Sequence, residues 1–81
     1  MKDQEMKLEE QYSDCTFYLN EEKNRRIAIS KCYQKIGSRQ MFAVRVIEVD
    51  EITGNAKSGE TVATRCTHSQ AMVIAREHYF K

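Results

Sequence analysis

The stretch that decides the fold is Met-Phe-Ala-Val-Arg-Val-Ile-Glu-Val-Asp, residues 41–50. It is the longest run of strand-favouring residues in the chain, and a turn signal, Thr53-Gly54-Asn55, follows it. Successive side chains of a strand point to opposite faces, so the apolar residues divide into two sets. One face carries Phe42, Val44 and Val46, and the other carries Ala43, Arg45, Ile47 and Val49. We interpret the stretch as the central strand of a small sheet, with both faces partly covered or with a bulge at Val46-Ile47.

Three further strands are predicted around this one. They comprise residues 15–19, residues 26–35 and residues 60–66, which are rich in β-branched and aromatic side chains or alternate in polarity. The connections are the polar residues 20–24, the Gly37-Ser38 turn and a hairpin loop over residues 50–59. In that hairpin loop, Gly54 and Gly59 tolerate positive φ. Hairpin connections predict antiparallel pairing throughout.

A helix is predicted from His68 to the end of the chain. Thr67-His68-Ser69-Gln70 is a capping-box pattern, with a hydroxyl at the first position and an amide three residues later. One face carries Ala71, Ile74, Ala75 and His78 at helical spacing, flanked by Met72 and Tyr79. We expect that stripe to lie on the sheet, which leaves Val73 and Phe80 pointing away from it.

The fold class that follows is α+β, a small antiparallel sheet of three to four strands (β-β-β-β-α) with the helix packed on one face. Residues 13–81 form this single domain. Residues 1–12 are polar, and we expect either a frayed arm or a short helix over residues 3–11. One short helix cannot cover both apolar sets of residues 41–50. The second cover is the N-terminal segment, a second subunit or a partner, and the sequence leaves these three open.

Composition limits the class of protein. Eighty-one residues make one domain, and 41% hydrophobic with 31% charged residues indicates a soluble, folded chain. The chain has no apolar run near 18 residues and no apolar core of a signal peptide at its start, so we expect a cytoplasmic protein. Three widely spaced cysteines, Cys15, Cys32 and Cys66, indicate reduced thiols.

Basic residues gather in the middle of the chain, where residues 15–47 carry seven Lys and Arg against two Glu. The predicted nucleic-acid-binding set is Arg25, Arg26, Lys31, Lys35, Arg39 and Arg45, with Tyr18 or Tyr33 stacking on bases. The second half of the chain contains Phe42-Ala-Val, a Thr-Gly turn, a fourth strand, and Thr67-x-x-x-Ala71 at the start of a helix. These features are similar in layout to the sheet-plus-helix DNA-binding domains of phage integrases. The resemblance covers about half of the chain. It implies DNA binding by a basic sheet face.

Catalytic and metal sites are not expected. The chain has no glycine-rich phosphate loop, no nucleophile elbow and no paired acidic motif. Cys66-x-His68 is not accompanied by the local Cys or His pairs that structural zinc sites use. We therefore predict no enzyme activity, no cofactor, no small-molecule substrate and no metal.

The leading functional prediction is a non-catalytic protein-interaction module, an adaptor or inhibitor of the type that phages and mobile elements encode. It docks on a larger protein or self-associates, and a homodimer fits either reading. Aromatic and arginine side chains are the usual anchors of interfaces. The predicted partner-binding residues are Tyr18, Arg26, Tyr33 and Arg45 on the sheet, with Val73 and Phe80 on the helix. Nucleic-acid binding is the alternative.

Overall fold

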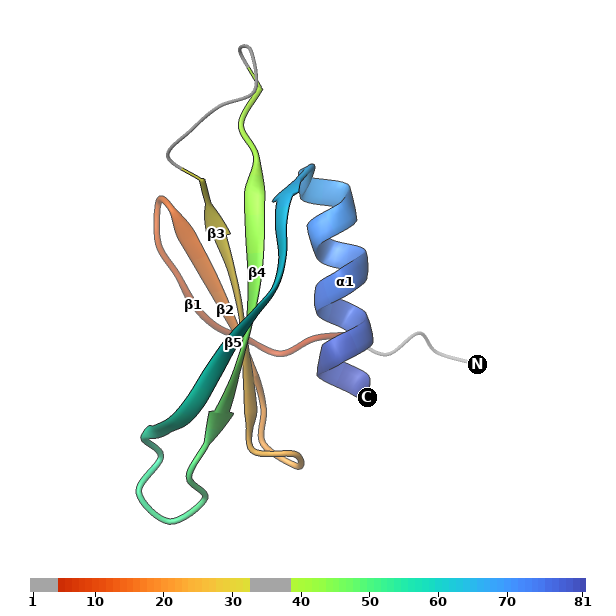
Figure 1. The fold of residues 1–81 in the computed structure, drawn as a ribbon. Coiled ribbons are helices and arrows are strands. Elements are labelled where there is room, and N and C mark those ends of the chain that lie inside the picture. The colour runs from red at the N-terminus through yellow and green to blue at the C-terminus, as the bar shows by residue number, and fades with distance from the viewer. Residues whose placement is uncertain (1–4, 33–38) are drawn as a thin grey trace.

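The computed structural model describes residues 5–32 and 39–81, and in these ranges five antiparallel strands precede one helix (Figure 1). The elements are β1 (Leu8–Gln11), β2 (Cys15–Asn20), β3 (Arg25–Lys31), β4 (Phe42–Val49), β5 (Ala56–Cys66) and α1 (His68–Phe80). Each strand pairs with the next one along the chain, so sheet order equals sequence order. The predicted α+β class, antiparallel pairing and C-terminal helix on the sheet are confirmed. The described part of the sheet has five strands, whereas three to four were predicted.

The helix predicted over residues 3–11 is wrong. Residues 8–11 form the edge strand β1, and residues 1–4 lie outside the described ranges. The chain turns back at Ser13 and Asp14, where the Tyr12 N–H donates to the Cys15 carbonyl at 2.7 Å. Pairing along β2 then supplies backbone hydrogen bonds that outweigh the modest helix propensity of Glu and Gln.

The stretch that decides the fold is β4, as predicted, but it is not the centre of the sheet. Because β1 adds a strand at the far side, β3 is the middle strand. The predicted strand over residues 26–35 ends at Lys31 in the described part, and residues 33–35 lie outside it. The predicted division into two faces agrees with the register, which aligns Ile29 with Val44 and Ala28 with Arg45.

The fourth predicted strand begins earlier than expected. β5 starts at Ala56 instead of residue 60, so Gly59 lies inside a strand and pairs with Ile47. Of the glycines in the described ranges, Gly54 has a positive φ, +76°, in the hairpin turn. The β4–β5 register shifts at three places, and Arg65 has a φ of 55°, so β5 is an irregular edge strand.

The capping box at the start of α1 is confirmed. The Gln70 N–H donates to the Thr67 hydroxyl at 3.2 Å, and the Thr67 N–H donates to the Gln70 side-chain oxygen at 3.0 Å. The buried stripe differs from the predicted one, because Ala71, Ala75 and Tyr79 are the buried residues of the helix. The two alanines let α1 approach the sheet closely, and the core beneath it is formed by Ile27, Ile29, Val44 and Cys66.

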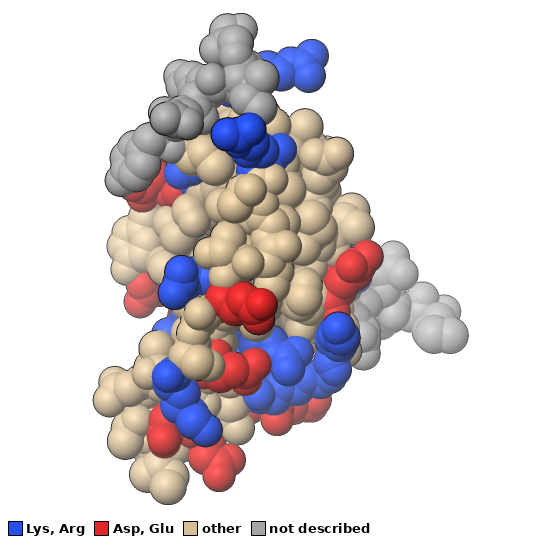
Figure 2. Space-filling view, in the orientation of Figure 1, with Lys and Arg blue, Asp and Glu red and all other residues tan. Residues whose placement is uncertain are grey.

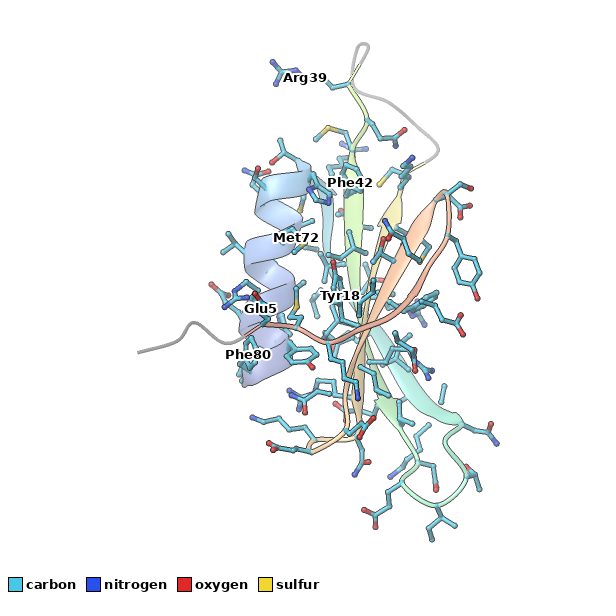
Figure 3. All side chains as sticks on the ribbon, turned by 180° about the vertical axis from the view of Figure 1, so that it is seen from behind. Glu5, Tyr18, Arg39, Phe42, Met72 and Phe80 are labelled. Carbon is cyan, nitrogen blue, oxygen red and sulfur yellow. The ribbon has the colours of Figure 1, made fainter. Side chains whose placement is uncertain are left out.

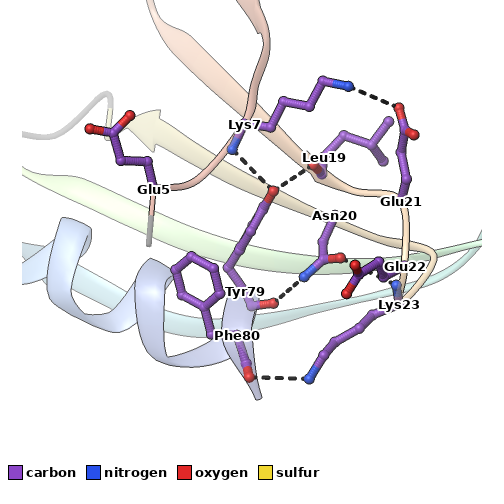
Figure 4. Close-up of a pocket in the computed structure, with 9 residues that line it drawn as sticks. All are labelled: Glu5, Lys7, Leu19, Asn20, Glu21, Glu22, Lys23, Tyr79 and Phe80. Carbon is purple, nitrogen blue, oxygen red and sulfur yellow. Dashed lines mark hydrogen bonds and ion pairs between the residues drawn. The ribbon is translucent and has the colours of Figure 1, made fainter. Parts of the chain in front are cut away.

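Tyr79 attaches the end of α1 to the sheet (Figure 4). Its hydroxyl donates to the Leu19 carbonyl at 2.8 Å and accepts from the Lys7 N–H at 3.0 Å. The buried Asn20 amide donates to the Tyr79 carbonyl at 2.6 Å. The N-terminal segment therefore crosses the sheet on the same side as α1, where Met6 packs against the core.

Candidate protein-binding surface

The face of the sheet opposite α1, here called the open face, is the candidate site. The register aligns its side chains in rows, Cys15–Ser30–Ala43, Phe17–Ala28–Arg45–Thr61 and Leu19–Arg26–Ile47–Gly59. Figure 1 shows α1 on one side of the sheet, and within residues 5–32 and 39–81 no element lies over the other side. Ala28 is nevertheless buried, because it lies between the larger Phe17 and Arg45. The N-terminal segment, one of the three possible covers, does not cover this face in the described part of the chain.

One half of the open face, over β1 to β3, carries a paired charge. Arg26 donates to both carboxylate oxygens of Glu9, at 2.6 and 3.0 Å. This two-pronged ion pair raises the pKa of Arg26 above its ordinary value. Beside it, the rings of Tyr12 and Phe17 meet edge to face with centroids 6.0 Å apart. These residues and Glu10 line a shallow hollow of about 310 Å³.

The other half of the open face, over β4 and β5, carries an arginine that has no hydrogen-bond or ion-pair partner in residues 5–32 and 39–81. The exposed Arg45 side chain crosses to β5 and lies over Gly59. A Cβ placed on Gly59 would come within 2.9 Å of Arg45 Nε and Nη2, so the glycine leaves room for the guanidinium. The hollow at this place is about 290 Å³ and is lined by Arg45, Ile47, Ala56, Lys57, Ser58 and Gly59.

The turn between β4 and β5 presents an isoleucine to solvent. Ile52 is 89% exposed at the tip. The Asp50 carboxylate accepts hydrogen bonds from the N–H groups of Ile52 (2.8 Å) and Thr53 (3.0 Å). These bonds, that from Thr53 first, lower the pKa of Asp50 below its ordinary value. The tip is therefore held in one conformation while it exposes an apolar side chain.

The residues predicted to bind a partner are dispersed. Arg26 and Arg45 lie on the open face, and Val73 is 57% exposed on the outer side of α1. Tyr18 lies between sheet and helix, with its hydroxyl 3.9 Å from the Met72 sulfur (Figure 3). Phe80 is half-buried against Tyr79, and the Arg76 guanidinium lies 5.3 Å from its ring centroid. Tyr33 lies outside the described residues.

The predicted nucleic-acid-binding residues are also divided between places. Arg25 is on the helix side of the sheet, where it donates to Glu48 at 3.3 Å and to the His78 carbonyl at 2.7 Å. Arg26 is paired with Glu9. Lys31 and Arg39 belong to the end of the sheet remote from the β4–β5 turn, and Lys35 lies outside the described residues (Figure 3). On the face shown in Figure 2, basic and acidic side chains intermingle without an extended patch of one sign.

The hollow around Tyr79 has a different character (Figure 4). It measures about 430 Å³ and is lined by Glu5, Lys7, Leu19, Asn20, Glu21, Glu22, Lys23, Tyr79 and Phe80. Its polar groups pair with one another, as Lys7 does with Glu21 at 3.2 Å and Lys23 with the Phe80 carbonyl at 3.1 Å. The hollow therefore belongs to the attachment of α1 to the sheet.

In the described ranges, the side chains that could bind a metal ion do not cluster at one place. No three His, Cys, Asp or Glu residues there are grouped so as to hold a metal ion. The three cysteines are free thiols, and burial raises the pKa of Cys15 above its ordinary value. The helix of the described part is neither long nor apolar enough to cross a bilayer.

Sequence reasoning assigned Ile47 to the face that needs a second cover, but it did not single out Phe17, Ile52 or Gly59 as residues of the candidate surface. Because side chains alternate along residues 15–19, Phe17 and Tyr18 point to opposite faces of the sheet. Phe17 therefore lies on the open face if Tyr18 lies on the helix side. Ile52 is an apolar residue inside a turn signal, which is itself unusual. The sequence pattern predicts a loop at Gly59, and a loop residue is not expected to pack against a side chain of β4.

Comparisons of this chain with protein-family models, with curated proteins and with solved structures return no match. Function is therefore argued from the open face and the β4–β5 turn alone.

Proposed function

We propose that this chain is a non-catalytic protein-binding module that docks the open face of its sheet onto a larger protein. The observation that carries the proposal is the pairing of apolar and arginine side chains on a sheet face that no described element covers. Antiparallel sheets commonly expose one face to water, and the side chains on that face are normally polar. Here the half-buried Phe17 and Ile47 occupy outward positions beside the buried Ala28. Apolar groups flanked by arginine are typical of interface anchors.

The sheet edges are poorer docking sites than the face. β1 has four residues, of which two are glutamates, and short charged edges resist addition of a further strand. β5 is long, but it is bulged and carries Lys57, Glu60 and Arg65. These features disfavour both strand addition by a peptide and edge-to-edge dimers.

Nucleic-acid binding has weaker support. Two of its six predicted residues, Arg25 and Arg26, are paired with carboxylates, and Lys35 lies outside the described residues. Of the other three, Lys31 and Arg39 lie at one end of the sheet, whereas Arg45 lies in the middle of β4. A phosphate backbone needs several free cations along one track.

The test is capture of partners from the native cell's lysate with the whole chain as bait. Matched variants are Ile47→Asp on the open face and Val73→Asp on the outer side of α1. Ile47→Asp is expected to reduce capture at least about tenfold, as at an interface anchor, while Val73→Asp leaves it unchanged. Equal loss in both variants, or none in either, contradicts docking by the open face.

Nuclease and salt separate the two partner classes in the same assay. Capture through protein contacts should survive nuclease and change little between about 50 and 200 mM salt, whereas a phosphate binder loses affinity steeply over that range. Loss of all partners after nuclease treatment would establish nucleic-acid binding instead. Light scattering on the purified chain reports whether it self-associates, and the same measurement on Ile47→Asp tests whether the open face forms that contact.

A further inference from the structure

The exposed Arg45 side chain lies across the sheet towards β5. It projects from β4, an internal strand, and its guanidinium lies over Gly59 of the neighbouring strand. The glycine has no side chain at the point where a Cβ would meet Nε and Nη2 at 2.9 Å. A long side chain that already lies against a surface loses less rotamer freedom when it binds. The arrangement suits recognition of a ligand by a preorganised arginine.

The hydrogen-bonding capacity of this guanidinium is unused. Arg45 makes no hydrogen bond or ion pair with any residue in ranges 5–32 and 39–81, although an arginine offers five N–H donors. Its hollow contains a second cation, Lys57, and no carboxylate. Lys57 lies near enough to Asp50 to contribute to the lowered pKa of that acid, so Arg45 is the freer of the two. Ile47 and Ala56 supply the apolar part of the lining.

Resting on the proposed docking by the open face, we infer that the partner presents an acidic segment, with a carboxylate taken by Arg45 and a neighbouring apolar side chain packed on Ile47. The planar fork of arginine matches a carboxylate with two parallel hydrogen bonds. Apolar lining beside the cation favours a protein segment over a nucleic-acid backbone, whose phosphates would meet only Arg45 and Lys57 among the described residues that line this hollow.

A second copy docked symmetrically, open face to open face, is a poor source of the acid. The described acids of that face are already engaged, since Glu9 pairs with Arg26 and Glu10 accepts from the Tyr12 hydroxyl. Charge complementarity to Arg45 therefore favours a different chain over such a symmetric dimer.

The experiment titrates the whole chain with a short soluble peptide that carries glutamate and leucine in equal numbers. The matched probe has glutamine in place of glutamate, and binding is followed by NMR shifts and by anisotropy of the labelled peptide. The expected result is shifts centred on the amides of Ile47, Lys57 and Gly59, with affinity at least about tenfold lower for the glutamine peptide. Arg45→Gln should lower affinity for the acidic peptide by a similar factor. Arg39→Gln, which alters an exposed arginine at the other end of the sheet, should not.

Three results would overturn the inference: equal binding of both peptides, no binding of the acidic peptide, or an undiminished affinity in Arg45→Gln. A DNA oligonucleotide that binds more tightly and displaces the acidic peptide from Arg45 would overturn it in favour of nucleic acid. The proposed function is tested separately, because capture that is sensitive to Ile47→Asp and insensitive to Arg45→Gln retains docking by the open face and removes only the acidic partner.

Discussion

Replacing Gly59 by alanine should weaken binding at Arg45 while leaving the fold as stable as before or more so. The new Cβ would lie 2.9 Å from Nε and Nη2 and 3.2 Å from Cζ of Arg45. Ordinary contacts between such atoms are about 3.5–4.0 Å, so the guanidinium must move by about 0.5–1 Å. The atoms that must yield are the far end of a flexible side chain, and the movement costs the fold little.

The stability side of this prediction follows from the strand. Gly59 lies in β5 without the left-handed backbone of Gly54, so alanine fits its conformation. Glycine inside a strand is less favourable than alanine by roughly 0.5–1 kcal/mol, chiefly through chain entropy. Gly59→Ala should therefore raise the free energy of unfolding by up to about 1 kcal/mol. Affinity for the acidic peptide should fall about threefold to tenfold, the loss expected when one long side chain must be ordered anew.

Gly54→Ala is the matched control. Gly54 has a φ of +76° and no atom within 4 Å of its notional Cβ, so alanine there strains the backbone without touching Arg45. It should lower stability by about 1 kcal/mol and leave peptide affinity unchanged. Urea unfolding and peptide titration measure both quantities for both variants. If Gly59→Ala bound the acidic peptide as tightly as the parent chain, Gly59 would not be what holds Arg45 ready.

Three further predictions concern the rest of the molecule. Tyr79→Phe removes the hydroxyl that joins the N-terminal segment to β2 and should lower the free energy of unfolding, measured in urea, by about 1–2 kcal/mol. Tyr12→Phe, which removes a hydroxyl at the surface, should leave the free energy of unfolding almost unchanged. Similar effects of the two variants would contradict the role of Tyr79. Asp50 has a folded pKa below its unfolded value of about 4, so its stabilisation of the turn is present above that pH and is lost as the pH falls through the folded pKa. Amide shifts of the turn, followed by NMR, should therefore have a midpoint below about pH 4, and a midpoint at or above it refutes the hydrogen bonding. Cys15, whose pKa is raised by burial, should be alkylated by iodoacetamide at pH 8 more slowly than free cysteine, and an equal rate would show an exposed thiol.

Local signals in the sequence predicted the elements that depend on local interactions. Thr67 and Gln70 form a capping box because both partners lie within one turn of helix. Residues 41–50 formed a strand because their alternation and composition suit one. Residues 8–11 show the opposite case, since their helix-forming composition was overridden by the free edge of β2, a partner that local reasoning does not see.

The candidate site could not be predicted from strand alternation alone, because it also depends on which arginines form ion pairs. Arg25 and Arg26 are adjacent in sequence, and alternation alone sends them to opposite faces. Composition could not show that Arg25 meets Glu48 and Arg26 meets Glu9 while Arg45 meets a glycine. Those pairings decide which of these three arginines has no hydrogen-bond or ion-pair partner among the described residues.

The sequence by itself determined an α+β chain with antiparallel hairpins, a capped C-terminal helix and a strand whose two faces both carry apolar residues. These properties follow from periodicity, turn residues and capping, which act over a few positions. It is the tertiary contacts that place residues 8–11 at the edge of the sheet and Met6 against the core on the helix side, so that the described N-terminal residues leave the open face uncovered, and that put Gly59 under Arg45. Contacts of that kind join residues far apart in the chain, and their choice depends on which edges and faces remain free once the sheet has assembled.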